Sequence, residues 1–227
     1  VLTLDAGGTN LVFNAFKGGK AIHAGIRKDA RAHELDRCLA NMKAGHTIVL
    51  ADGDYDGYIS KVEAKIASED HPVVIKAATN GGVSVTLEYA FNIKDSEYIT
   101  FQGFVLKAAD DSWGILAVEN SKNIKILDTE FDCAPDVAHE NSSMKPLVLK
   151  GLSDTVEIAY CYFHDKDIDG GFITTEYYDE DEDPEKGISK NVHIHHNYFQ
   201  NMTFNGNDCD RESIVFGDSE SQIYTTN

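Results

Sequence analysis

The stretch Ser121-Lys122-Asn123-Ile124-Lys125-Ile126 decides the fold, because its pattern of a Ser followed by alternating apolar residues recurs along the chain. The other copies are Ser96-Glu97-Tyr98-Ile99-Thr100-Phe101, Ser153-Asp154-Thr155-Val156-Glu157-Ile158 and Ser189-Lys190-Asn191-Val192-His193-Ile194. The anchors Ile99, Ile124, Val156 and Val192 lie 25, 32 and 36 residues apart. Repetition at roughly this period is typical of a solenoid, and apolar alternation at every second residue indicates that the repeated unit is a strand.

An aromatic position follows the repeat in three copies, at Phe131, Phe163 and Phe199, and the same spacing extends back to Val73 and Ile48. A constant strand with a lengthening connection predicts a β-helix whose loops are inserted on one face. The fold class is therefore all-β, a right-handed parallel β-helix.

An α-helical cap is expected before the first coil. Leu35, Cys38, Leu39 and Met42 have the spacing of one helical face within residues 31–44, and Gly45 ends the pattern. Such a helix would cover the apolar end of a solenoid. We divide the chain into a hairpin-like segment at 1–30, which has the character of a foreign piece, and a parallel β-helix domain at 31–227.

Composition restricts the partners. The formal net charge of −18 argues against nucleic acid, and no apolar run approaches the ~20 residues that a membrane helix needs. A polyanionic partner remains open because a bound cation can bridge two carboxylates. The four cysteines lack zinc-site spacing, and we expect Cys133 and Cys161 to be buried core thiols.

Five stretches together resemble polysaccharide lyase family 6, the alginate lyases and chondroitinase B. They are Ala44-Gly45-His46-Thr47-Ile48-Val49-Leu50-Ala51-Asp52-Gly53-Asp54-Tyr55, His71-Pro72-Val73-Val74-Ile75-Lys76-Ala77, Tyr98-Ile99-Thr100-Phe101-Gln102-Gly103-Phe104, Ile194-His195-His196-Asn197-Tyr198-Phe199 and Glu212-Ser213-Ile214-Val215-Phe216-Gly217. The resemblance covers about residues 31–227 and rests on the order and spacing of all five.

The resemblance implies β-elimination on an acidic polysaccharide in a secreted or periplasmic protein. In that family a Ca²⁺ ion held by one Asn and two Glu neutralises the uronate carboxylate, a Lys removes the proton and an Arg assists the leaving group. The Asn ligand corresponds to Asn207, with Asn205 as the alternative. The Glu pair, the Lys and the Arg are expected beyond residue 227, so we interpret the chain as C-terminally truncated and expect self-association through its open end.

Candidate substrate contacts lie where the inserted loops at 133–147 and 164–190 would flank a cleft. They are Lys150, His164, Lys166, Tyr178 and Arg211, with an exposed strand position as the alternative interpretation for Lys150. In the last copy of the repeat, alternation places His193 and His195 on one face and His196 on the other, and a metal site there is not expected.

Two further motifs admit other interpretations. Leu4-Asp5-Ala6-Gly7-Gly8-Thr9-Asn10 resembles the phosphate-binding turn of ROK-family sugar kinases, although the rest of that fold has no counterpart in the chain. The stretch from Asp52 to Glu63 matches the ligand spacing of an EF-hand loop, but the residues before it indicate a strand, so a solvated acidic turn is the alternative.

The sequence thus predicts an acidic-polysaccharide lyase that acts on an alginate-type uronate, with Ca²⁺ as cofactor and an anionic polysaccharide as partner. The alternatives are a non-catalytic carbohydrate-binding β-helix and a sugar kinase remnant. A Lys and an Arg in the following coils would favour the first function over the second.

Overall fold

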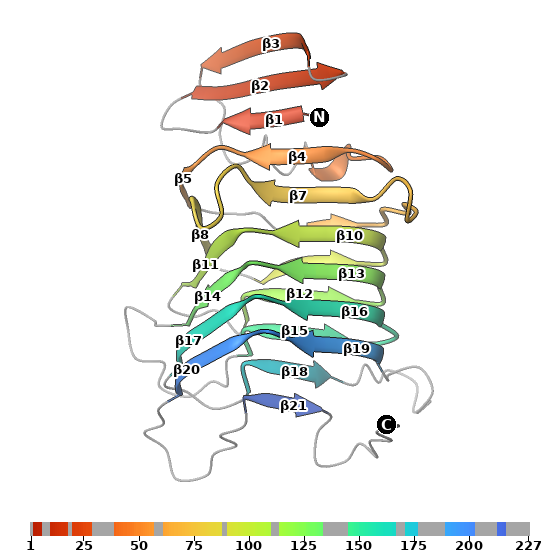
Figure 1. Cartoon of the computed structure of the whole chain (residues 1–227), viewed down its shortest axis with the longest axis vertical. Helices are drawn as coiled ribbons and strands as arrows, with labels where there is room; N and C mark the ends of the chain where they lie inside the picture. Colours follow the sequence, from red (N-terminus) through yellow and green to blue (C-terminus); the bar gives the residue numbers. More distant parts are fainter. Residues whose placement is uncertain are drawn as a thin grey trace.

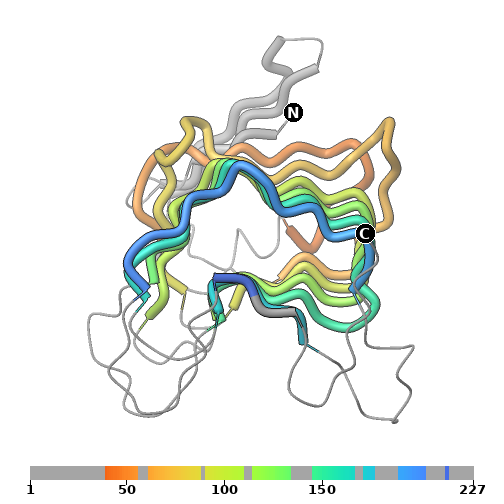
Figure 2. Tube along the Cα trace, turned by 60° about the horizontal axis from the view of Figure 1, so that its bottom comes forward, coloured from red at the N-terminus to blue at the C-terminus, as the bar shows by residue number. Residues whose placement is uncertain are grey.

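A computed structural model describes residues 39–56, 61–87, 90–109, 114–133, 145–166, 171–176, 189–202 and 213–216, together with the backbone of 2–5, 10–17 and 20–28. The described chain winds through three parallel strands per coil, and the coils stack along one axis (Figure 1). Figure 2 looks along the stack and shows successive coils lying almost on top of one another. The predicted parallel β-helix is confirmed.

Three sheets form the walls of the coil, and each strand of a coil belongs to a different sheet. Sheet A contains β4 (Thr47–Leu50), β7 (Val73–Ala77), β10 (Glu97–Gln102), β13 (Lys122–Leu127), β16 (Asp154–Ala159) and β19 (Lys190–His195). Sheet B contains β5 (Gly53–Asp56), β8 (Val83–Leu87), β11 (Phe104–Ala108), β14 (Glu130–Asp132), β17 (Tyr162–Lys166) and β20 (Tyr198–Met202). Sheet C contains β6 (Lys61–Glu63), β9 (Phe91–Lys94), β12 (Leu116–Glu119), β15 (Leu147–Lys150), β18 (Ile173–Glu176) and β21 (Ile214–Phe216).

The register of sheet A confirms the spacing of the repeat. Ile99 pairs with Val73 on one side and Ile124 on the other, and the series continues through Val156 to Val192. The extension to Ile48 is wrong by two residues, because Ile48 pairs with Ile75. The connection from β6 to β7 runs from residue 64 to 72, and a connection of that length lets the register differ from the one set by the two-residue corners between β9 and β10 and between β12 and β13.

The repeated Ser closes the corner between sheets C and A. Ser96, Ser121 and Ser153 are buried, and the Ser121 hydroxyl donates to the Glu119 carbonyl at 2.7 Å and accepts from the Ser96 amide at 3.1 Å. Two residues after each Ser the backbone has positive φ, at Tyr98, Asn123, Thr155 and Asn191. Side-chain hydroxyls thus satisfy backbone groups that a bend would otherwise leave unpaired.

Aromatic rings fill the interior of the C-terminal coils. Phe131 and Phe163 stack with their centroids 4.4 Å apart, and Phe163 and Phe199 follow at 5.2 Å. Because the register is parallel, like residues lie one above another, and each inward position becomes a column along the axis. Cys133 and Cys161 are buried free thiols, as predicted.

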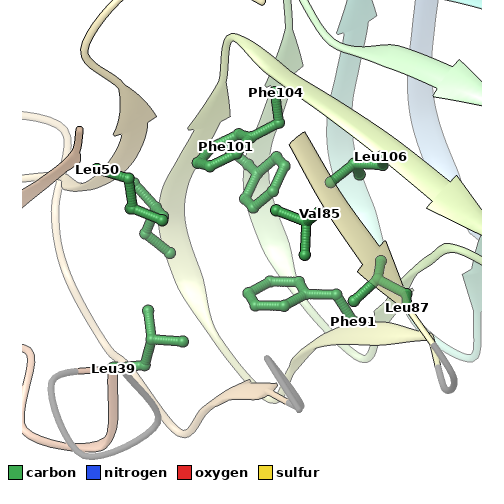
Figure 3. A pocket seen from close by; sticks show the side chains of 9 residues that line it. Leu39, Leu50, Val85, Leu87, Phe91, Phe101, Phe104 and Leu106 are labelled. Carbon is green, nitrogen blue, oxygen red and sulfur yellow. The ribbon is translucent and has the colours of Figure 1, made fainter. Parts of the chain in front are cut away.

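An apolar pocket lies inside the N-terminal coils, between the three sheets (Figure 3). Its lining consists of Leu39, Leu50, Ile75, Val85, Leu87, Phe91, Phe101, Phe104 and Leu106. With no polar group in its wall, this pocket is part of the core and offers nothing to orient a sugar.

The expected helix over 31–44 lies mostly outside the described residues, but Leu39 and Met42 are buried against the core at that end. The N-terminal segment continues sheet A through β1 (Leu2–Asp5), β2 (Asn10–Lys17) and β3 (Lys20–Lys28). β1 pairs parallel with β4, whereas β2 pairs antiparallel with both β1 and β3. Within the described residues, no helix combines the length and apolar character needed to cross a bilayer.

Candidate functional site

A row of alternating charge runs along the outer face of sheet C, at the end of each strand. Glu63, Lys94, Glu119, Lys150 and Glu176 occupy the same register position in successive coils. The ammonium of Lys94 lies 2.6 Å from the Glu119 carboxylate, and that of Lys150 lies 2.9 Å from Glu176. Opposite charges directly across a strand pair stabilise the register.

One more cation, Lys145, lies beside the last two members of this row. Lys145 precedes β15, and its Nζ lies 2.7 Å from Oε1 of Glu176, while Lys150 contacts Oε2. Burial raises the pKa of the Glu176 carboxyl, but the hydrogen bonds from the two lysines outweigh it, so this pKa lies below its usual range. Lys145, Lys150 and Glu176 thus form one group on sheet C, in which two lysines contact a single carboxylate.

The outer face of sheet C is buried next to this group. Ala117 and Val148 have no exposed surface, although alternation points both side chains away from the core. Thr174 lies on the same face, and among the described residues its buried hydroxyl has no hydrogen-bond partner. This face therefore combines apolar, hydroxyl and charged groups.

His164 occupies a different face, the outer side of sheet B. Its Nε2 lies 3.1 Å from Glu130 Oε1, its Nδ1 lies 2.8 Å from Asp165 Oδ2, and the Tyr162 ring stacks on it at 4.3 Å. Burial lowers the pKa of His164, but the hydrogen bonds to Asp165 and Glu130 more than compensate, so the pKa is raised. With 8% of its surface exposed and both nitrogens engaged, His164 presents no free donor to a substrate in this structure.

Lys166 is fully buried. The sequence suggests it as a substrate contact, which would require an exposed side chain. The cause of the burial is a left-handed residue at Asp165, φ 56°, which breaks the alternation of β17 and turns Lys166 inward. Asn201 repeats this conformation one coil later and donates to Asp165 at 2.7 Å. The positive charge of Lys166 lies near enough to the Cys133 thiol to oppose the rise that burial causes in the pKa of Cys133.

The histidines at the end of β19 and directly after it, His195 and His196, form a third cluster, beside sheet A. His195 lies 3.3 Å from Glu157, and its Nδ1 lies 2.8 Å from Nδ1 of His196. The expected placement of His196 on the opposite face is wrong, because its φ of 54° bends the chain and turns its ring toward His195. The described residues contain no group of three or more His, Cys, Asp or Glu side chains arranged to hold a metal ion.

The structure brings together only part of the predicted site. Lys150 lies on sheet C, His164 on sheet B and Lys166 inside the coil. Tyr178, Arg211, Asn207 and its alternative Asn205 lie outside the described residues. The EF-hand pattern from Asp52 to Glu63 is divided between β5 and β6 of two different sheets, and Asp52 accepts a hydrogen bond from the Thr79 amide.

Sequence reasoning missed the pairing of Lys145 and Lys150 with Glu176. A signal was present, since Lys94 and Glu119 each stand two residues before a Ser of the repeat, and Lys150 stands three before the next. Charges of alternating sign at one position of a solenoid repeat are neighbours in space.

Comparison with known proteins identifies relatives of this fold. The family model of chondroitinase B matches residues 30–226. No protein of curated function matched the sequence. Among solved structures, a mannuronic acid-specific polysaccharide family 6 lyase from human gut microbiota is similar, with a TM-score of 0.62 and 18% identity over 82% of this chain.

A mutant of the family 6 alginate lyase AlyGC gives a TM-score of 0.62 and 18% identity over 83% of this chain. A family 6 alginate lyase in complex with a trisaccharide gives 0.57 and 18% over 85%. This chain spans only 42%, 25% and 40% of the lengths of these three proteins. At such identities the structures establish a shared fold, whereas the family model covers most of the sequence, and the chain belongs to the chondroitinase B family.

Proposed function

We propose that this protein acts on an acidic polysaccharide, as a lyase that cleaves an alginate-type uronate chain by β-elimination. The observation that carries the proposal is the match of the chondroitinase B family model over residues 30–226. The similar structures support it, since they include alginate lyases and one complex with a trisaccharide. An extracytoplasmic location, secreted or periplasmic, is part of the proposal because such polymers lie outside the cell.

The reaction removes the proton at C5 of a uronate and breaks the bond from C4 to the glycosidic oxygen, which leaves a C4–C5 double bond. Removal of that proton places negative charge on the carboxylate side of the sugar, so the site must supply positive charge, a base and an acid. A Ca²⁺ ion, when bound, would supply the positive charge at the carboxylate. The described residues do not assemble a metal site, and Asn207, the candidate ligand, lies outside them.

What the described residues supply is positive charge on the outer face of sheet C. Lys145 and Lys150 face outward on sheet C with side chains 32% and 21% exposed, and are thus within reach of a bound anion. The chain's net charge of −18 would otherwise repel a polyuronate.

A non-catalytic carbohydrate-binding β-helix is the second candidate. In this role the described residues bind the polymer without taking part in chemistry. Lys150 is engaged by Glu176 and Lys166 is fully buried, so neither is placed to act as a base.

Ultraviolet absorbance of the unsaturated uronate distinguishes the two functions. The purified chain is incubated with alginate and, separately, with dermatan sulfate, each with Ca²⁺ and with a chelator. The lyase proposal predicts rising absorbance that the chelator abolishes. A flat trace from folded protein that still binds the polymer would make this chain a binding module, and the same assay on a form of the protein that includes the predicted catalytic Lys and Arg would then decide whether the lyase proposal fails.

A further inference from the structure

We infer that His195 and His196, at the end of β19 and directly after it, form a binding site for a divalent transition-metal ion of tetragonal geometry, Cu²⁺ or Ni²⁺. The inference goes beyond the proposed function and does not depend on it. It concerns an ion different from the Ca²⁺ of the proposed lyase reaction, held by nitrogen rather than oxygen ligands.

A bend in the backbone brings the two rings together. Alternation along a strand would place His195 and His196 on opposite faces. His196 instead has a φ of 54°, at the corner position that Tyr160 occupies one coil earlier with a φ of 58°. Nδ1 of His196 consequently lies 2.8 Å from Nδ1 of His195. Imidazole nitrogens are the commonest metal ligands in proteins, so this contact joins two potential ligand atoms.

The separation of the two nitrogens favours one coordination geometry. With nitrogen–metal distances of about 2.0–2.1 Å, two ligands at a right angle lie about 2.8–3.0 Å apart, whereas two at a tetrahedral angle lie about 3.3–3.4 Å apart. The 2.8 Å between the Nδ1 atoms of His195 and His196 fits the right angle. Tetragonal sites with nitrogen and oxygen ligands are typical of Cu²⁺ and Ni²⁺, whereas Ca²⁺ takes oxygen ligands.

Glu157 favours the tautomer of His195 that a metal needs. Oε1 of Glu157 lies 3.3 Å from Nε2 of His195. A carboxylate only accepts hydrogen bonds, so this contact favours a proton on Nε2 and leaves the lone pair of His195 on Nδ1. Metal-binding histidines almost always donate their other ring N–H to a carboxylate, a carbonyl or water in this way. The second oxygen of Glu157 lies 3.1 Å from the Lys125 ammonium, which helps to hold the carboxylate in position.

His196 needs only a change of tautomer. The contact of 2.8 Å requires one proton between the two Nδ1 atoms, and with Nδ1 of His195 unprotonated this proton belongs to His196. When a metal ion binds, the proton moves through water to Nε2 of His196, so both Nδ1 lone pairs become available and no proton is lost overall. His196 is exposed, so its ring can turn its lone pair toward the ion, and the Tyr160 ring stacked on it at 5.1 Å keeps it beside His195.

Two imidazoles leave the other coordination positions to water or another oxygen ligand. The part of the chain that the structure describes arranges no three His, Cys, Asp or Glu side chains as a closed metal site. The site is therefore open, as catalytic metal sites are and structural ones are not. The net charge of −18 favours the approach of a divalent cation.

Calorimetric titration of the full chain with Cu²⁺, in an excess of Ca²⁺, tests the inference. We expect His195→Gln and His196→Gln each to weaken the site at least about tenfold, because each removes a ligand. His193→Gln is the matched control from the same strand and should leave the affinity unchanged. Glu157→Ala should weaken binding about tenfold, and Glu157→Gln, which keeps an acceptor for Nε2, by less. Zn²⁺ should bind more weakly than Cu²⁺.

Electron paramagnetic resonance of the Cu²⁺ complex gives an independent readout. We expect the axial spectrum of a tetragonal ion with coupling to two nitrogen ligands. A copper site that keeps its affinity in both His195→Gln and His196→Gln would overturn the inference, and so would coupling to a single nitrogen. Equal losses in His193→Gln and His195→Gln would also overturn it, because they would reflect a general affinity of surface histidines. Urea unfolding of each variant shows whether a lost site reflects lost fold.

Discussion

The imidazole of His164 lies 3.1 Å from the carboxylate of Glu130, which belongs to the preceding coil. The other ring nitrogen, Nδ1, lies 2.8 Å from Oδ2 of Asp165. An ionised carboxylate only accepts hydrogen bonds, so both nitrogens must carry protons for both contacts to form. At pH values below its raised pKa, the protonated ring therefore joins two coils.

This contact predicts a pH dependence of stability. Because the pKa of His164 is raised in the folded state, its contribution is fully present below the usual pKa of about 6.5 and is lost as pH rises through the folded value. Unfolding free energies measured across that range should fall with pH in wild type and fall less in His164→Gln. An NMR titration in which the pKa of His164 is at or below that of a free histidine would contradict the account.

The stacked phenylalanines predict where the fold is most sensitive. Phe163 is fully buried between Phe131 and Phe199, so Phe163→Ala should lower the free energy of unfolding by about 3–5 kcal/mol. Tyr198, 61% exposed, is the comparison, and Tyr198→Ala should change it by less than about 1 kcal/mol. Urea denaturation measures both, and similar losses for the two variants would argue against the stacked core.

The serine corner gives a third prediction. Ser121→Ala removes the acceptor of the Ser96 amide and leaves that buried N–H unpaired, which should cost about 1–3 kcal/mol of stability. Ser121→Thr keeps the hydroxyl and serves as the control, with a smaller loss from the added methyl. Should Ser121→Ala unfold at the wild-type urea concentration, the hydroxyl would have no structural role.

The buried thiols predict chemical inertness. Burial raises the pKa of Cys133, which the Lys166 ammonium opposes, and burial raises that of Cys161 to about 12. Since the thiolate is the reactive form, neither should react with a thiol reagent at pH 8 in the native protein. Peptide mapping by mass spectrometry after labelling would locate the modified cysteines. Labelling of Cys133 or Cys161 without denaturant would show that the coil opens there.

The repeat made much of the fold predictable from sequence. A Ser followed by alternating apolar residues encodes both a corner and a strand, and parallel register carries that pattern unchanged from Ile99 to Val192. The placement of Lys166 and His196 could not be predicted in the same way. Lys166 follows a residue with positive φ, Asp165, and His196 has a positive φ itself. Neither residue is a glycine, so the sequence carries no clear sign that the alternation of side chains ends there.

The candidate site was harder to predict because it depends on contacts between coils. Lys150 was recognisable as a cation near a long connection, but its partner Glu176 belongs to the next coil, 26 residues later. Only the register shows that the two face each other. Substrate contacts chosen from sequence were consequently scattered over sheets B and C and the interior.

Mass spectrometry of the products from alginate tests the central claim most directly. A lyase breaks the chain without adding water, so each new non-reducing end carries a double bond, and its mass is lower than that of a hydrolysis product by one water. The account predicts such unsaturated oligouronates, with Ca²⁺, from a form of the protein that includes the predicted catalytic Lys and Arg, and none in the presence of a chelator. Saturated products, or intact polymer after incubation with folded protein, would contradict it.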